Sequence, residues 1–164
     1  MIYEKILTEL ERNDIKYLVI GGVAVNLYGY QRITKDLDIM LSFEKENMEK
    51  FVKIVKTLGL KPKAPVEPEE LANKDKRDFW IREKNMKVFS FYNPENDLEY
   101  IDIMILDHID FDEAYLKKRI MHDGRITTTV ISIDDLITLK EIASRPRDNA
   151  DLEVLKKIKE KYYG

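Results

Sequence analysis

Residues 19–41 read VIGGVAVNLYGYQRITKDLDIML, and this stretch decides the fold. It begins at the end of an apolar strand, breaks at a glycine pair, continues through a short apolar helix and a polar loop, and ends in a second strand. Successive side chains of a strand point to opposite faces of the sheet. The stretch therefore predicts that Asp36 and Asp38 share one face, with Leu37 and Ile39 on the other.

Two carboxylates side by side repel each other, which raises the pKa of one of them unless a positive charge lies nearby. Mg²⁺ would supply this charge, since it binds oxygen ligands, usually one or two carboxylates together with water and substrate phosphates. Gly21 and Gly22 provide the second feature, because a backbone without Cβ atoms lets a phosphate approach the N–H groups at the start of the helix. Together these features predict a site for a metal ion and a nucleotide.

The glycine pair, the spacer of residues 23–35 and the two acids resemble the signature of the DNA polymerase β-like nucleotidyltransferase superfamily. The fuller pattern GGxAxxLxGxxRxTxDxD resembles the branch that contains AbiEii-type toxin nucleotidyltransferases and their relatives. The residues that match this pattern are Gly21, Gly22, Ala24, Leu27, Gly29, Arg32, Thr34, Asp36 and Asp38.

The resemblance implies a fold of the α/β (α+β) class, in which a minimal nucleotidyltransferase core of a mixed β-sheet flanked by helices precedes a C-terminal helical pair. A chain of 164 residues suits a single domain. We expect this domain to cover residues 1–164, with the core at about 1–133 and the C-terminal helices at about 134–162.

The composition is that of a soluble globular protein, with 44% apolar and 36% charged residues. The chain has no cysteine, which excludes disulfides and cysteine-based zinc sites and fits a reducing cytoplasm. Residues 1–14 are amphipathic and charged, so they predict neither a signal peptide nor a membrane span. A net charge of −3 is not typical of a strongly basic nucleic-acid binder, but it is compatible with a local basic face.

A third carboxylate, Asp102, lies in the middle of an apolar strand that we predict over residues 98–106. A buried charge without a partner is costly, so a salt bridge to an arginine or lysine is one explanation. The resemblance implies another, because the family pattern has a third carboxylate on a later strand of the same sheet. We therefore expect Asp102 to bind metal or to activate the acceptor, together with Asp36 and Asp38.

Residues 135–155, DLITLKEIASRPRDNADLEVL, also resemble this branch of nucleotidyltransferases. The residues that match its pattern are Lys140, Arg145, Arg147, Asp148 and Asp151. The resemblance implies phosphate contact here, since a lysine and two arginines near a helix start can hold triphosphate oxygens. The alternative is that the arginines pair with the two aspartates and fix the corner between two helices.

Arg32 and Thr34 lie between the glycine pair and the acids, where they either contact the nucleotide or stabilise the loop. His108 and His122 have no ligand spacing between them, and we expect both to be surface or structural residues. The nucleotide-binding residues that we expect are Gly21, Gly22, Arg32, Thr34, Lys140, Arg145 and Arg147.

Hydrophobic periodicity and turn residues predict the remaining elements. Ser42 and Asp134 are expected to cap the helices that follow them, Gly59 is expected to end the first of these helices, and residues 60–78 are expected to form a loop with one helical turn. The expected helices end at about residues 12, 28, 58, 118, 143 and 162, and the last begins at 149. The expected strands are 17–20, 36–41 and 98–106, a hairpin of 79–82 with 86–92, and a strand pair that turns at 122–124.

We expect a nucleotidyltransferase that uses two Mg²⁺ ions, held by Asp36, Asp38 and Asp102, to move an NMP from an NTP to a hydroxyl acceptor. RNA, a small molecule and a protein hydroxyl are the candidate acceptors. The alternative is a non-catalytic nucleotide- or partner-binding protein that acts with a cognate protein in a toxin–antitoxin or regulatory pair.

Overall fold

The structure, a computed structural model, describes residues 2–164. Its helices are α1 Ile2–Arg12, α2 Gly21–Leu27, α3 Lys45–Thr57, the 3-10 helix η1 Pro68–Ala72, α4 Lys74–Lys84, α5 Phe111–Leu116, α6 Ile133–Ala143 and α7 Pro146–Tyr162. Its strands are β1 Tyr17–Ile20, β2 Leu37–Leu41, β3 Lys61–Pro62, β4 Val88–Asn93, β5 Asn96–Met104, β6 Arg119–Asp123 and β7 Ile126–Val130.

The described strands form a mixed sheet in the order β3-β4-β5-β2-β1-β7-β6. Strand β2 runs antiparallel to β1 and parallel to β5, and β1 runs parallel to β7. This arrangement puts the two strands that carry acids, β2 and β5, side by side in the middle of the sheet. The predicted mixed sheet with flanking helices is confirmed.

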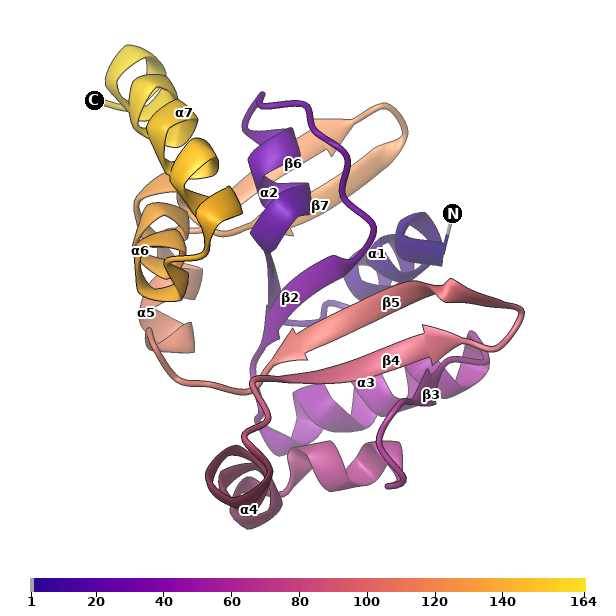
Figure 1. The fold of residues 1–164 in the computed structure, drawn as a ribbon. Helices are drawn as coiled ribbons and strands as arrows, with labels where there is room; N and C mark the ends of the chain where they lie inside the picture. Colours follow the sequence, from indigo (N-terminus) through magenta and orange to yellow (C-terminus); the bar gives the residue numbers. More distant parts are fainter. Residues whose placement is uncertain (1) are drawn as a thin grey trace.

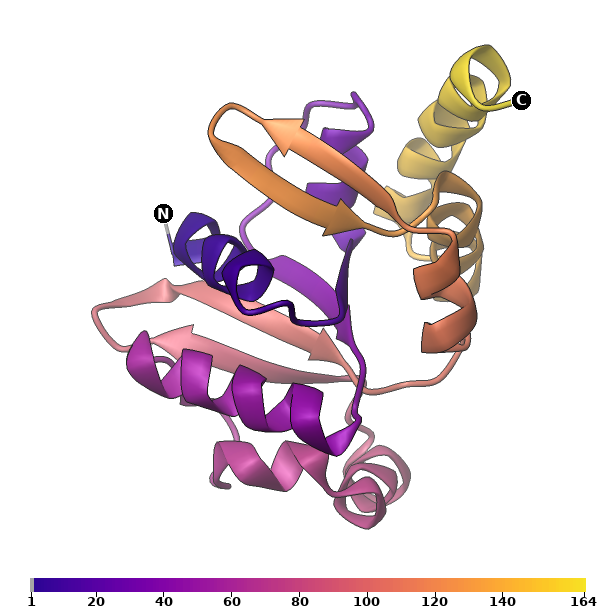
Figure 2. The same cartoon turned by 180° about the vertical axis from the view of Figure 1, so that it is seen from behind.

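Helices cover the two faces of the sheet unequally. Helices α1, α3 and α4, with η1, lie over one face, as Figure 2 shows. Helices α2 and α7 lie on the opposite side, near β1 and β7, and no helix stands in front of β4 and β5 there (Figure 1). Part of the sheet face next to the acids is therefore open.

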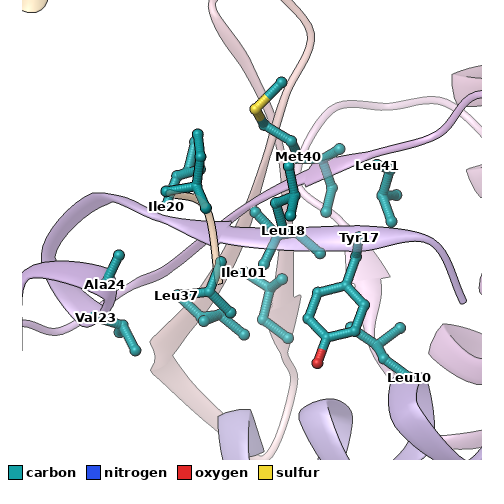
Figure 3. Close-up of a cluster of buried hydrophobic side chains, with 14 of the residues drawn as sticks. Leu10, Tyr17, Leu18, Ile20, Val23, Ala24, Leu37, Met40, Leu41 and Ile101 are labelled. Atoms are coloured by element: carbon teal, nitrogen blue, oxygen red, sulfur yellow. The ribbon is translucent and has the colours of Figure 1, made fainter. Parts of the chain in front are cut away.

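The core lies where α1, β1, α2, β2 and β5 meet, and Figure 3 shows side chains from these elements in contact around β1. Leu18 and Tyr17 are completely buried. The Tyr17 hydroxyl donates to Glu11 Oε1 at 2.6 Å and accepts from the backbone N–H of Thr129 at 3.0 Å. Because this buried hydroxyl is hydrogen-bonded, the ring adds apolar burial to the core without an unpaired polar group.

The predicted hairpin of residues 79–82 with 86–92 is wrong, because residues 74–84 form helix α4. Asn73 caps this helix by accepting a hydrogen bond from the backbone N–H of Lys76 at 3.1 Å. The helix ends at Asn85, which has a positive φ of 51°. Trp80 is buried against Phe89, with 5.3 Å between the ring centroids. Tertiary packing of this indole thus overrides the short alternating pattern.

Two predicted helix caps and one helix start are also wrong. Helix α3 begins after Glu44, and Ser42 instead accepts a hydrogen bond at its carbonyl from Asn47 Nδ2 at 2.9 Å. Ser132, not Asp134, caps α6 by accepting from the backbone N–H of Asp135 at 3.2 Å. Helix α7 begins at a proline rather than at residue 149, because the fixed φ of proline suits the first helical position.

None of the described helices is long and apolar enough to cross a membrane.

Candidate functional site

The three predicted carboxylates meet in the middle of the sheet. Asp38 on β2 lies directly opposite Asp102 on β5 in the parallel register, so both side chains leave the same face. Asp36 lies immediately before β2 and two residues before Asp38, on the same face. All three side chains are partly buried. The structure therefore brings together the acids that the sequence predicts at this site.

Burial raises the pKa of Asp38 to about 7, and repulsion from Asp102 and Asp36 contributes to this rise. The positive charges of Lys140 and Arg145 act in the opposite direction. These two residues come from the end of the chain, so the C-terminal helices contribute to the electrostatics of the acid site. Without a cation, the site does not favour full ionisation of its carboxylates.

Burial also raises the pKa of Asp102, and the charge of Asp36 adds to the effect. A hydrogen bond from Ser90 and the charge of Lys63 oppose this rise. The Ser90 hydroxyl donates to Asp102 Oδ1 at 2.6 Å from the neighbouring strand β4. This bond fixes one carboxylate oxygen and leaves Oδ2 without a hydrogen bond from the described residues.

The donor chemistry of the site fits a hard cation whose shell is completed by a substrate. Carboxylate oxygens are ligands that Mg²⁺ prefers. However, no group of three or more histidine, aspartate or glutamate side chains within residues 2–164 is close enough to hold an ion by itself. The residues therefore suit Mg²⁺ that is bound together with phosphates and water, rather than a metal enclosed by the protein.

The glycine pair at the start of α2 is packed against Asp38 and against the loop between α2 and β2. A Cβ atom at Gly21, whose φ is +66°, would lie 2.3 Å from Asp38 Oδ2. A Cβ atom at Gly22 would lie 2.6 Å from Thr34 Oγ1 and 3.2 Å from Arg32 Nη2. Only glycine allows this close approach, so the backbone at the start of α2 borders both Asp38 and the polar side chains of the loop.

Arg32 is held in a fixed position by a distant part of the chain. Its Nε and Nη2 atoms donate to the two carboxylate oxygens of Asp151 on α7, each at 2.8 Å. The backbone of Arg32 also exchanges two hydrogen bonds with the Asn26 amide, both at 3.0 Å. The guanidinium therefore lies beside Gly22 in an orientation set by α7.

Lys140 is buried between the last two helices, with 5% of its side chain exposed. Its Nζ atom lies 3.2 Å from Asp148 Oδ1 and 2.9 Å from Asp151 Oδ2. Arg145 binds Asp148 through its Nε atom at 2.9 Å. Arg147 is exposed and has no ion-pair partner among the described residues. The corner between α6 and α7 is thus a buried ion network that reaches the loop through Asp151.

Two contacts of this site are absent from the sequence-based expectations. The hydrogen bond from Ser90 to Asp102 depends on the observed register of β4 and β5, which places the two residues opposite each other and shifts between Tyr92 and Asn93, so strand alternation alone does not predict it. The pairing of Asp151 with Arg32 gives no local signal, since the two residues are 119 positions apart.

The remaining candidates lie outside the acid site. His108 and His122 are exposed, and a hydrogen bond of 3.0 Å joins His122 Nδ1 to Thr127 Oγ1. A cleft of about 550 Å³ lies between the end of α2 and α7, and another of about 330 Å³ lies between α1 and α3. No predicted site residue lines either of these two clefts.

Comparison with known proteins gives matches among solved structures. No family profile and no curated protein sequence matches the chain. The lincosamide antibiotic adenylyltransferase LnuA, solved with lincomycin bound, aligns with a TM-score of 0.61 and 17% identity over 94% of each chain. ANT(2'')-Ia, solved in complex with adenylyl-2''-tobramycin, aligns with a TM-score of 0.58 and 15% identity over 96% of this chain and 91% of its own.

A third match is an antigenic nucleotidyltransferase-like protein from Paracoccidioides brasiliensis, with a TM-score of 0.58 and 10% identity over 96% of this chain and 73% of its own. The alignments cover nearly the whole chain, so they include the acid-bearing strands and the C-terminal helices. The chain therefore has the fold of these nucleotidyltransferases, and its predicted α+β class is confirmed.

Proposed function

We propose that the protein is a Mg²⁺-dependent nucleotidyltransferase that moves an NMP from an NTP to a hydroxyl group of an acceptor. The observation that carries this proposal is the register of β2 and β5, which sets Asp38 directly beside Asp102 on one face of a nucleotidyltransferase-like sheet. The raised pKa of Asp38 and Asp102 supports the proposal. Two carboxylates placed together repel each other, and a bound cation would neutralise their charge and stabilise the ionised forms.

In this proposal, Asp36, Asp38 and Asp102 hold two Mg²⁺ ions. Bound Mg²⁺ would neutralise the triphosphate and lower the pKa of the acceptor hydroxyl. Gly21 and Gly22 let the β- and γ-phosphates approach the backbone, because a Cβ atom at either position would collide with neighbouring side chains.

Arg32 and Thr34 complete the phosphate-binding surface from the loop. The Asp151 carboxylate accepts from Nε and from Nη2 of Arg32, and the Ile33 carbonyl accepts from Nη1 at 3.4 Å, so the second N–H of Nη2, beside Gly22, is left for a phosphate. Arg145, half-exposed, and Arg147, exposed, would contact the triphosphate from the α6–α7 corner. Lys140 would act mainly through its charge, which opposes the rise in the pKa of Asp38.

We also propose that the protein forms a single domain, belongs to the branch of AbiEii-type toxin nucleotidyltransferases and acts in the cytoplasm, with a cognate protein as its partner. The pattern in residues 21–38 and the Lys-Arg-Arg-Asp-Asp pattern in residues 140–151 support the branch. The absence of cysteine supports the compartment.

Transfer is tested directly with NTPs labelled at the α-phosphate, incubated with Mg²⁺ and with RNA, lincomycin, tobramycin or a protein extract as acceptors. We expect label in an acceptor with wild type, and none with EDTA. Asp102→Asn is expected to retain NTP binding and to lose transfer, since it keeps the shape of the side chain but removes its charge. Binding of NTP without transfer to any acceptor would instead support the non-catalytic nucleotide-binding protein.

A further inference from the structure

The sheet face formed by β3, β4 and β5 next to the acids carries aromatic and basic side chains. On the opposite face Phe89, Phe91 and Ile101 are almost completely buried under helices. No helix stands in front of β4 and β5 on the other face (Figure 1), and the side chains there are half-buried or exposed. We call this surface the open sheet face, and it consists of Lys61, Lys63, Ser90, Tyr92 and Tyr100.

The strand register places these residues in two rows that start at the acids. In the first row, the backbone N–H of Lys63 donates to the carbonyl of Ser90 at 2.9 Å, and the order is Asp38, Asp102, Ser90 and Lys63. In the second row, Tyr100 lies opposite Tyr92 and Tyr92 lies opposite Lys61, and Asp36, the residue before β2, extends this row if the parallel register of β2 and β5 is continued by one residue. Because neighbouring strands lie about 4.8 Å apart, each row leads from a carboxylate to a lysine across about 15 Å.

The open sheet face offers two kinds of contact. The Lys63 ammonium lies 5.2 Å from the centre of the Tyr100 ring, and neither Lys61 nor Lys63 has an ion-pair partner in residues 2–164. Tyr92 lies opposite Tyr100, so two rings adjoin on neighbouring strands. Aromatic rings stack with nucleobases of any sequence, and lysines bind phosphates.

The position of this surface relative to the acids indicates which substrate it would meet. Gly21 borders Asp38 from the side of β1 and α2, and Gly22 beside it borders Arg32, whereas the open sheet face extends from Asp102 in the opposite direction. In phosphoryl transfer the attacking and leaving oxygens are roughly in line across the phosphorus. A triphosphate on the glycine side therefore leaves the open sheet face to the acceptor.

We propose that the open sheet face binds the acceptor and that the acceptor is the 3′ end of a single-stranded RNA, with its bases on Tyr92 and Tyr100 and its phosphates on Lys61 and Lys63. This inference rests on the proposed nucleotidyl transfer. The 3′-hydroxyl oxygen forms a bond to the α-phosphorus, the bond to pyrophosphate breaks, and the hydroxyl proton passes to water beside Asp102. The lysines disfavour an amine-bearing antibiotic, since like charges repel.

Fluorescence anisotropy with a 5′-labelled 12-nucleotide single-stranded RNA and Mg²⁺ tests this proposal. Wild type is compared with Lys61→Ala/Lys63→Ala, and with Lys53→Ala/Lys84→Ala as a control of equal charge change on the exposed surface of the helices that cover the other face. A third variant, Tyr92→Leu/Tyr100→Leu, removes the rings and keeps the charge. Calorimetric titration with Mg²⁺ and NTP checks folding and the nucleotide site in each variant.

We expect salt-sensitive RNA binding by wild type and by the control. The plot of log K against log salt has a negative slope. Loss of two phosphate contacts should make this slope shallower by about 1.4 in the lysine variant. Loss of stacking should weaken binding at least about fivefold in the tyrosine variant without a change in that slope. RNA affinity equal to that of the control in both variants, or wild type that binds NTP but no RNA, would overturn the proposal. Absence of NTP binding by wild type would instead refute the proposed function on which it rests.

Discussion

Asp38 links the charge of the site to the stability of the protein. Its pKa is raised to about 7 in the folded chain, so between the ordinary pKa of an aspartate and about 7 the folded chain holds a proton that the unfolded chain has released. The free energy of unfolding of the metal-free protein should therefore fall as the pH rises through this range.

We predict that Asp38→Asn stabilises the metal-free protein by about 4 kcal/mol at pH 8, because the buried carboxylate charge is removed. The difference from wild type should grow between pH 4 and pH 7 and then stay constant. Urea unfolding in EDTA measures it, with Asp107→Asn as an exposed control of equal charge change. A difference that is independent of pH would contradict the account of Asp38.

Gly21 and Gly124 form a matched pair for testing the packing of the glycine cradle, which is the backbone of Gly21 and Gly22 at the start of α2. Both have a positive φ, of +66° and +62°, but a Cβ atom would collide with Asp38 only at Gly21. Each change to alanine should cost about 1–2 kcal/mol for the left-handed backbone. We predict that Gly21→Ala costs at least about 1 kcal/mol more than Gly124→Ala and also weakens NTP binding. If Gly21→Ala and Gly124→Ala lost equal amounts of unfolding free energy in thermal or urea melts, a Cβ atom at Gly21 would fit beside Asp38, and the prediction would be wrong.

At the residue scale, spacing along one strand was enough to predict that Asp36 and Asp38 share a face, because strand alternation is local. The partner of Asp102 could not be found in this way. It is Ser90 on an adjacent strand rather than an arginine or lysine, and that choice depends on the pairing of two strands.

At the scale of elements, Asp151 on α7 joins the C-terminal helices to the part of the site that holds Arg32 and Gly22. It is 1% exposed and accepts from both Arg32 and Lys140. Removing one partner of a buried ion pair leaves an uncompensated charge. We predict that Asp151→Asn lowers the free energy of unfolding by about 3 kcal/mol and weakens NTP binding, because Arg32 loses its fixed orientation.

Glu153→Gln on the same helix is the control for this prediction. Its ion pair with Lys157, at 3.6 Å, is exposed, so the change should cost less than about 0.5 kcal/mol. Urea unfolding measures both variants, and calorimetry measures their NTP affinity. If Asp151→Asn kept the NTP affinity of wild type, the α7 helix would have no part in positioning Arg32.

The elements that the sequence predicts correctly are those with a clear apolar period, such as β1, β2, β5 and α1. Helix α4 was missed because its only buried residue, Trp80, gives no periodic pattern, and its start depends on the Asn73 cap. The caps of α3 and α6 were misplaced because several polar residues compete near each helix start, and packing selects among them.

At the scale of the whole molecule, the site exists only when the chain is folded. Its acids come from β2 and β5, its glycines from the start of α2, and its buried ion network from α6 and α7. The patterns in residues 21–38 and 140–151 predict which residues belong to the site. The folded sheet adds what no local pattern holds, namely the open sheet face and the direction in which it leads away from Asp102.

The proposed site for Mg²⁺ and an NTP consists of Asp36, Asp38 and the glycine pair Gly21 and Gly22. Calorimetric titration of each of the four NTPs in the presence of Mg²⁺ measures its binding, with Asp36→Asn/Asp38→Asn and the exposed control Asp97→Asn/Asp107→Asn. We predict Mg²⁺-dependent binding of at least one NTP by wild type and by the control, and its loss in Asp36→Asn/Asp38→Asn. Wild type that binds none of the four NTPs, or binding that survives in Asp36→Asn/Asp38→Asn, would contradict the account.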